Sequence, residues 1–384
     1  MGNNFNYKST SYDCFGHEKI SKISKVIMTD ISQLKILAVV PRMYYPLLKG
    51  GLEISAHNIL SLLSNHCESI VVAGGKHTNN LFISKLERRV LGKYPSKGLV
   101  DNCQVLSDIW HPTDVNDLIP KYKPDVLICF YSGESDLARI INNNSLPTIY
   151  FVFGNKNVTY LKAKKNNNAY VCESNFIKRI IEKEIGQDAT VIKPIIAPED
   201  YLVERKGDNI LVINPHPIKG GDIVLQIAKK MPWRNFLIVG GWQHTSLNDD
   251  VIYIEKQLLK LKNVKRLPHT DNMKKIMEQS RCLLMPCRVE EAYGRSAAEA
   301  IISGIPVVAS DRGALPETVG AGGVIINIEE PIHKWVDALE LLYCDNDYYE
   351  KLSKNAIRES ITKNRQVTFI EGQLLELLQQ TLAY

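Results

Sequence analysis

Two acidic residues, Glu291 and Glu299, lie eight positions apart in the stretch "EEAYGRSAAEAIISGIPVVAS", with Gly294 between them. The glycine and proline at 304–306 should end a helix over 295–303, so Glu291 lies in the preceding loop and Glu299 one turn inside the helix. The backbone N–H groups at a helix N-terminus have no partner within the helix and attract anions. The stretch therefore predicts an anion site with an acid on either side of it.

The spacing of these two glutamates also bears on a second kind of chemistry, the acid–base pair of a glycosidase. Eight helical positions rise about 12 Å, whereas the two carboxylates of a retaining glycosidase lie about 5 Å apart. The spacing therefore favours an elongated ligand that is held at two ends. A simpler interpretation stays open, in which Glu291 caps the helix and Glu299 is a solvated surface acid.

A basic residue, Lys219, lies in "NPHPIKGGD", directly before Gly220 and Gly221 at the expected start of another helix. An ammonium group at such a place can reach a diphosphate in a cleft. Gly50 and Gly51 open a further helix after the first apolar run, where glycines let backbone N–H groups approach an anion. Each signal is weak alone, because most loop lysines are only solvated and paired glycines often form an ordinary turn.

The elements that must position these residues are short apolar runs alternating with amphipathic stretches. The apolar runs lie at 35–41, 69–75, 125–131, 147–153, 209–215, 235–241, 282–287, 305–310 and 323–328. Unbroken apolar strands are typical of parallel sheets that are covered on both faces. Strand–helix alternation in two sets predicts an α/β protein with two open, doubly wound domains.

The boundary between the two domains is expected at 195–201, where prolines interrupt the alternation. Residues 1–33 then form a polar N-terminal extension, 34–197 a first Rossmann-like domain and 198–364 a second one. The apolar helix expected at about 365–384 has no strand after it and is a candidate to pack back on the first domain. Two such domains would face a central cleft at the carboxyl ends of their sheets, where these folds bind ligands.

The composition excludes several classes of protein. A chain of 384 residues with 45% hydrophobic and 23% charged residues is typical of a globular protein with two domains. The net charge of +5 suits an anionic ligand or an anionic membrane surface, but it is no signature of nucleic-acid binding. The eight cysteines include no C-x-x-C pair, so we expect no zinc site, no disulfide framework and a reducing cytoplasmic location. No apolar run is long enough to span a bilayer.

The long stretch "EEAYGRSAAEAIISGIPVVASDRGALPETVGAGGVIIN" resembles the E-x7-E region of the retaining glycosyltransferases of family four. "KGGLE" resembles the first-domain glycine loop of that family, "KGGD" its phosphate-lysine loop and "FLIVGG" the strand that follows. The resemblance covers residues 35–384 and is stronger in the second domain. The E-x7-E block is its specific part.

The resemblance implies a GT-B fold, an activity and a set of site residues. The activity would be transfer of a sugar from a nucleotide diphosphate sugar, such as a UDP- or GDP-sugar, to a hydroxyl acceptor in glycan, polysaccharide or glycolipid synthesis. It would retain the anomeric configuration and need no metal or other cofactor. Glu291 would be the catalytic residue and would hold the donor sugar with Ala292 and Tyr293, and Glu299 would hold the ribose. The diphosphate would be bound by Gly50, Gly51, Lys219, Gly294, Arg295 and Ser296.

Two residues depart from the family pattern. Asn214 stands where the family usually has an arginine five residues before the lysine, and Phe153 stands where it often has a histidine after a first-domain strand. Arg295 is a candidate to supply the missing positive charge. The departures keep a second hypothesis open, a nucleotide-sugar sensor that does not catalyse transfer. A GT-B-fold sugar-nucleotide epimerase is a third hypothesis, and the E-x7-E spacing speaks against it.

Two charged stretches have simple interpretations. "DND" at 345–347 has the form of a D-x-D metal motif, but it follows a helix late in the chain, so we expect a structural role. The basic run at 85–97 would either face an acidic lipid, with the protein on the inner face of a membrane, or form a solvated helix face.

Overall fold

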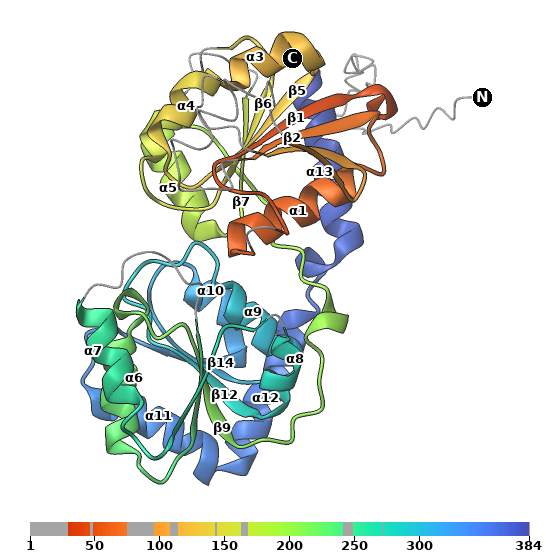
Figure 1. The fold of residues 1–384 in the computed structure, drawn as a ribbon. Coiled ribbons are helices and arrows are strands. Elements are labelled where there is room, and N and C mark those ends of the chain that lie inside the picture. The colour runs from red at the N-terminus through yellow and green to blue at the C-terminus, as the bar shows by residue number, and fades with distance from the viewer. Residues whose placement is uncertain are drawn as a thin grey trace, which may run out of the picture.

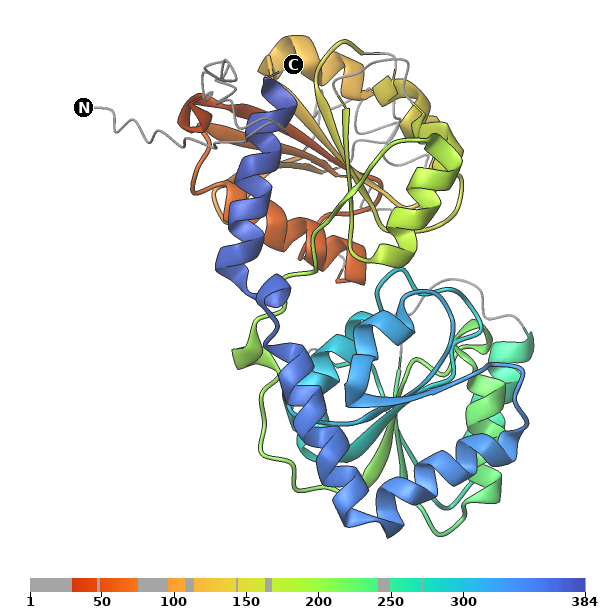
Figure 2. The same cartoon turned by 180° about the vertical axis from the view of Figure 1, so that it is seen from behind.

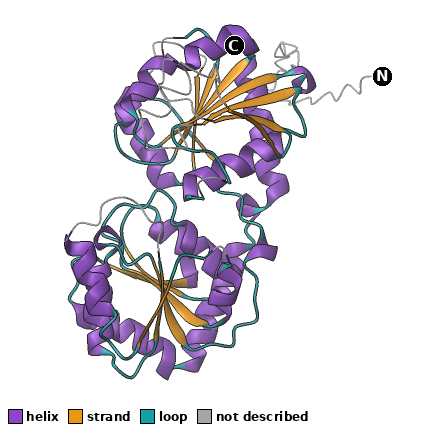
Figure 3. Cartoon of the chain, in the orientation of Figure 1, coloured by secondary structure: helices purple, strands orange, loops and turns teal. Residues whose placement is uncertain are grey.

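The structure is a computed structural model, and it describes residues 30–46, 49–74, 96–107, 114–142, 144–162, 168–240, 249–270 and 272–383. These residues form two α/β domains, one above the other in Figure 1. Within each domain the strands lie at the centre and the helices cover them (Figure 3). Nearly all of the predicted N-terminal extension and most of the basic run at 85–97 lie outside the described residues.

The first domain is built on a sheet with the strand order β3-β4-β2-β1-β5-β6-β7-β8. Neighbouring strands are parallel except for the antiparallel pair β3 and β4. The strands are β1 (Lys35–Val40), β2 (Ser69–Gly74), β3 (Ser96–Val100), β4 (Cys103–Ser107), β5 (Val126–Tyr131), β6 (Thr148–Val152), β7 (Asn168–Cys172) and β8 (Thr190–Val191). Every residue of β5 and β6 is buried, because helices cover both faces of the sheet.

Alternate residues of each central strand pack under different helices of the first domain. One buried cluster joins the sheet to α1 (Gly51–Leu63) and α13 (Val367–Leu382). The other joins it to α3 (Asp114–Tyr122), α4 (Ser135–Asn142) and α5 (Asn175–Ile185). The period-two alternation of a strand therefore places the apolar side chains in two separate cores.

The second domain has the strand order β11-β10-β9-β12-β13-β14, with all neighbouring strands parallel. Its strands are β9 (Asn209–Ile213), β10 (Phe236–Val239), β11 (Val264–Leu267), β12 (Ser280–Met285), β13 (Val307–Ser310) and β14 (Gly323–Ile326). Its helices are α6 (Gly221–Lys230), α7 (Asp249–Leu258), α8 (Met273–Glu278), α9 (Arg295–Ile302), α10 (Leu315–Val319), α11 (Ile332–Cys344) and α12 (Asn346–Ser360). The chain winds one way from β9 and the other way from β12, so the loops after these two neighbours diverge at a topological switch point.

The last helix, α13, belongs to the packing of the first domain although it follows the second along the chain. After α12 the chain crosses back, and Figure 2 shows α13, in dark blue, running along the first domain. Its residues Ile370, Leu374 and Leu378 lie in the same buried cluster as Leu60 of α1. The two domains are thus joined by two chain crossings, one at 192–208 and one at 361–366.

Candidate functional site

The switch point of the second domain brings together two residues that are 72 positions apart in the chain. Lys219 follows β9 and Glu291 follows β12, and the Nζ atom of Lys219 donates a hydrogen bond to Oε1 of Glu291. The thiol of Cys287 donates to the same oxygen over 3.3 Å. Although burial alone disfavours the ammonium, the negative charge of Glu291 raises the pKa of Lys219 above its ordinary value. Lys219 and Glu291 therefore form a charged pair in a partly buried place.

Glycines let the two loops approach each other at this point. Gly220 has a φ of 79°, and a Cβ atom there would lie 1.9 Å from the carbonyl oxygen of Pro286. A Cβ atom on Gly221 would lie 1.9 Å from the carbonyl oxygen of Pro215. A larger residue at 220 would force the loop after β9 away from the loop after β12, and one at 221 would collide with Pro215 of its own loop. Packing therefore requires glycine at both positions. The sequence interpretation had explained these glycines only by a close approach to phosphate.

The loop after β12 ends at the N-terminus of α9, which begins at Arg295 as predicted. Its N-cap is Gly294, with a φ of 89°, and a Cβ atom there would lie 2.6 Å from Cδ2 of Leu315. No side chain caps this helix, and its first turn contains no acid. The N–H groups of Gly294, Arg295 and Ser296 therefore offer partial positive charge within five residues of Glu291 along the chain.

Glu299 lies inside α9 and is engaged by the same helix. Its carboxylate accepts a hydrogen bond of 2.8 Å from Nε of Arg295, and Tyr201 lies beside both side chains. Only 7% of Glu299 is exposed, and this burial raises the pKa of its carboxyl. Glu299 is therefore not the solvated surface acid of the simpler interpretation.

Within the described part of the chain, no hydrogen bond or ion pair joins the guanidinium of Arg295 to Asn214, the position of the missing arginine. It is bound to Glu299, and its Nη1 atom is buried without a hydrogen-bond partner among the described residues. Asn214 follows β9 with a left-handed φ of 56°, and its backbone N–H is bonded to the carbonyl of Val239 over 2.9 Å. That Arg295 replaces the missing charge stays a prediction.

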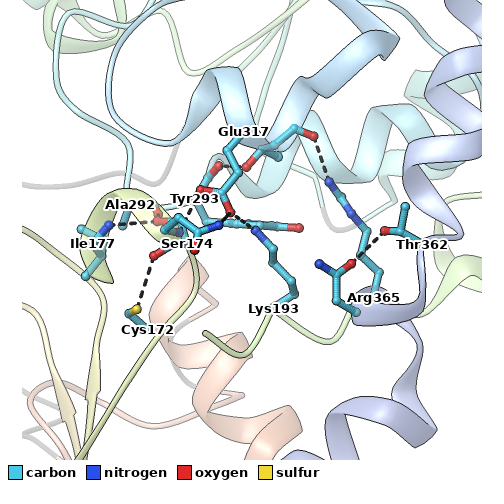
Figure 4. Close-up of polar contacts among 12 residues, drawn as sticks. Cys172, Ser174, Ile177, Lys193, Ala292, Tyr293, Glu317, Thr362 and Arg365 are labelled. Carbon is cyan, nitrogen blue, oxygen red and sulfur yellow. Dashed lines mark hydrogen bonds and ion pairs between the residues drawn. The ribbon is translucent and has the colours of Figure 1, made fainter. Parts of the chain in front are cut away.

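The predicted sugar contacts, Ala292 and Tyr293, lie where the two domains meet. Ala292 packs against the core of the first domain. The Tyr293 ring is 3% exposed, with Nζ of Lys193 at 5.4 Å from its centroid. Figure 4 shows both residues beside Ser174 of the first domain. The side chain of Tyr293 is thus taken up by packing at the domain boundary.

The first-domain glycines stand at the start of α1. Gly50 is its N-cap, and Gly51 is exposed with open space where a Cβ atom would lie. The neighbouring Glu53 is fully buried, and Nε of Arg42 lies 3.1 Å from its Oε1 atom. This acid turns back over Gly50, since a Cβ atom there would lie 2.3 Å from Oε2. The carboxylate already supplies negative charge to this helix N-terminus, which makes it a poorer anion site than the N-terminus of α9.

Glu173, which follows β7, is an acid at the domain boundary that sequence reasoning missed. It accepts a hydrogen bond of 2.9 Å from the Ser55 hydroxyl of α1. Burial raises the pKa of Glu173 to about 7, against the opposing effects of Arg295 and Lys193. The available signal was an acid directly after the apolar letters "AYVC".

A metal site and a membrane span are two further features that the described residues can test. Among the residues described, no group of three or more His, Cys, Asp or Glu side chains is arranged to hold a metal. Asp345 of the "DND" motif caps α12 by accepting a hydrogen bond of 2.8 Å from the backbone N–H of Tyr348. No helix in the described ranges is long and apolar enough to cross a membrane.

Known proteins resemble part of the chain in sequence. Residues 210–359 match the family model described as glycosyl transferases group 1. D-inositol 3-phosphate glycosyltransferases of Mycobacterium tuberculosis and Mycobacterium bovis are 30% identical over 155 residues, or 38% of this chain. The match covers 32% of each relative, so the chain spans about a third of the length of these curated relatives.

Solved structures resemble about nine tenths of the chain in fold. A sucrose-phosphate synthase from Thermosynechococcus elongatus superimposes with a TM-score of 0.73 at 14% identity, over 91% of this chain and 99% of that chain. Anabaena HepE in complex with UDP-glucose gives 0.70 at 17% identity, over 90% and 99%. A glycosyltransferase from Rickettsia africae gives 0.69 at 15% identity, over 91% and 99%. The chain has the GT-B fold, and residues 210–359 within it are similar to the glycosyl transferases group 1 family.

Proposed function

We propose that the protein transfers a sugar from a nucleotide diphosphate sugar to a hydroxyl acceptor and retains the configuration at the anomeric carbon, as in the E-x7-E enzymes of family four. One observation carries the proposal. Lys219 and Glu291 are paired at the switch point of the second domain, next to the uncapped N-terminus of α9. A cation and a helix N-terminus suit a diphosphate, and a carboxylate beside them suits the hydroxyls of a sugar attached to it.

In this proposal, binding of the donor exchanges the partners of the Lys219–Glu291 pair. The diphosphate takes the ammonium of Lys219 together with the N–H groups of Gly294, Arg295 and Ser296. The Glu291 carboxylate then accepts hydrogen bonds from the donor sugar. These donors are fixed before the bond breaks, so they stabilise the charge that grows on the departing diphosphate without first having to reorganise.

The proton of the acceptor has a short route on the same face of the sugar. As the sugar–phosphate bond breaks, a phosphate oxygen becomes more basic and accepts the proton of the incoming hydroxyl. Attack and departure on one face retain the anomeric configuration. Glu299 would hold the ribose hydroxyls, which requires its carboxylate to turn from Arg295 or to accept from both. The positive charge comes from Lys219 and backbone amides, so a divalent metal is not part of this scheme.

The donor and acceptor classes are proposals that rest on similar proteins. HepE was solved with UDP-glucose, which makes a UDP-sugar the first donor to test. WaaG, with a TM-score of 0.66 at 13% identity, is described as involved in lipopolysaccharide biosynthesis. We therefore place the acceptor among the hydroxyls of a glycan, polysaccharide or glycolipid. We also propose a cytoplasmic enzyme that can associate with an anionic membrane surface, as the net charge of +5 suits.

A second candidate function, a nucleotide-sugar sensor without transfer, is favoured by Asn214, which removes one positive charge from the expected diphosphate site.

A panel of UDP-, GDP-, ADP- and TDP-sugars in a thermal-shift assay identifies the donor, because a ligand that binds the folded state raises the melting temperature. Release of the nucleoside diphosphate, measured with excess EDTA, then tests catalysis. Turnover with a product of retained configuration supports the proposal. Binding with neither donor hydrolysis nor transfer supports the sensor, and turnover that needs a restored metal contradicts the scheme above.

A further inference from the structure

We propose that Ser174, in the first domain, is a positioning residue for the proposed transfer reaction. It holds the backbone that carries Glu291 in the second domain and so couples the geometry of the site to closure of the two domains. The inference rests on the proposed function. It concerns a residue that none of the site predictions included.

The loop 291–293 is held by its three carbonyl oxygens. The carbonyl of Glu291 accepts from the backbone N–H of Ala314 over 2.8 Å. The carbonyl of Tyr293 accepts from the Thr318 hydroxyl. Both donors belong to the second domain, but the middle carbonyl, of Ala292, accepts from the hydroxyl of Ser174 over 2.6 Å (Figure 4). One of the three contacts that shape the loop therefore comes from the other domain.

Ser174 is fixed in place by its own domain. It is the N-cap of α5, directly after β7, and its side chain is fully buried. Its oxygen accepts from the backbone N–H of Ile177 over 3.3 Å while its proton goes to Ala292. A hydroxyl can accept and donate at once, so a single side chain ends a first-domain helix and binds a second-domain loop.

A charged contact lies beside this hydrogen bond and joins the same two elements. Glu317 of α10 accepts from the backbone N–H of Asn175 over 2.8 Å, and from its side chain over 3.1 Å. Lys193, of which 6% of the side chain is exposed, donates to the same carboxylate. The Glu317 carboxylate thus lies at the N-terminus of α5, where the helix dipole favours a negative charge. Thr318, which holds Tyr293, is the next residue on α10.

The loop 291–293 is therefore held in part by the contact between the two domains. Separating α5 from α10 would remove the hydrogen bond to Ala292 and leave Lys193 buried without its acid, which is unfavourable. The loop would then be held by second-domain donors alone. Because Glu291 begins this loop, its carboxylate is expected to keep its place opposite Lys219 best when the domains are closed.

A purely structural role, capping α5, is the alternative, and Ser174→Asp separates the two. Aspartate accepts at an N-cap as well as serine does, but it has no proton to donate to the carbonyl of Ala292. We expect Ser174→Asp to lower kcat by about 10-fold or more, as misplaced catalytic groups do. Its Kd for the bare nucleoside diphosphate should stay close to that of the wild type. Ser174→Thr keeps both bonds and should keep the activity.

A second variant and a second readout keep the test independent of how Ser174→Asp folds. Glu317→Gln weakens the charged contact and leaves both the α5 cap and the loop donors in place. Small-angle scattering should give a larger radius of gyration for Glu317→Gln, and for Ser174→Asp, than for the wild type. Wild-type kcat and scattering in both variants would overturn the proposal. If the wild type neither binds a nucleoside diphosphate nor transfers sugar, the proposed function fails, while the scattering still decides whether these contacts close the domains.

Discussion

At the scale of single residues, the proposed chemistry depends on Lys219 and Glu291, which form an ion pair. Both could be found from the sequence because each follows an apolar run that ends at the same edge of a parallel sheet. Their contact could not be found, because it depends on how closely two loops approach. The sequence analysis considered only the glycines of "KGGLE" and not Glu53. Nothing in this motif indicates that the Glu53 carboxylate is buried.

At this scale, Lys219→Ala should weaken binding of a nucleoside diphosphate more than binding of the monophosphate. The ammonium is proposed to meet the terminal phosphate, and a charge-assisted hydrogen bond is worth roughly 1.5–3 kcal/mol. Titration calorimetry with UDP and UMP measures the difference. Equal losses for the two ligands would place Lys219 away from the diphosphate.

Among the elements, the long apolar strands were the predictable part. The runs predicted as strands coincide with β1, β2, β5, β6, β9, β10, β12, β13 and β14. The sequence interpretation missed β3, β4, β7, β8 and β11. Of these, β7 begins with an asparagine and β11 carries Lys265 and Arg266. Such strands form because a neighbouring strand offers its hydrogen bonds, so tertiary pairing overrides local preference. Missing β7 also hid Glu173 and Ser174, which follow it directly.

The contact between the loops after β9 and β12 makes a prediction about stability. Gly220→Ala should destabilise the protein by about 2 kcal/mol or more, because alanine is strained at a left-handed φ and its Cβ atom would overlap the Pro286 carbonyl. Gly51→Ala is the matched control, since that Cβ atom would enter open space, and it should change stability by less than about 1 kcal/mol. Urea unfolding measures both variants. A Gly220→Ala protein as stable as Gly51→Ala would mean that the loops can separate at little cost.

In the whole molecule, two domains meet through loops at the carboxyl ends of their sheets. The sequence predicted two domains and a cleft, because the alternation of strands and helices repeats. It could not predict which residues cross between the domains. Lys193 and Glu317 are 124 positions apart, and neither stands in a motif that indicates a partner.

The domain boundary also gives the stability of the whole chain a pH dependence. The folded pKa of Glu173, about 7, lies above the ordinary value of 4.5, so the folded protein keeps a proton that the unfolded chain has released between these values. Stability from this group is therefore lost as the pH rises from about 4.5 to about 7. Glu173→Gln removes the titration, so its stability relative to the wild type should grow over that range. Urea unfolding at both ends of the range measures the free energy of unfolding of the two proteins. An equal change in that free energy for Glu173→Gln and the wild type would contradict the prediction.

The claim that sugar transfer takes place at the switch point is tested most directly by the turnover of Glu291→Gln. With the donor that binds and a hydroxyl acceptor, we expect nucleoside diphosphate release to fall about 100-fold or more, because the carboxylate that holds the sugar is lost next to the reacting bond. Its thermal unfolding should stay close to that of the wild type. The exposed Glu330→Gln variant is the matched control and should turn over normally. Equal turnover in Glu291→Gln and Glu330→Gln would contradict a transfer site at Glu291.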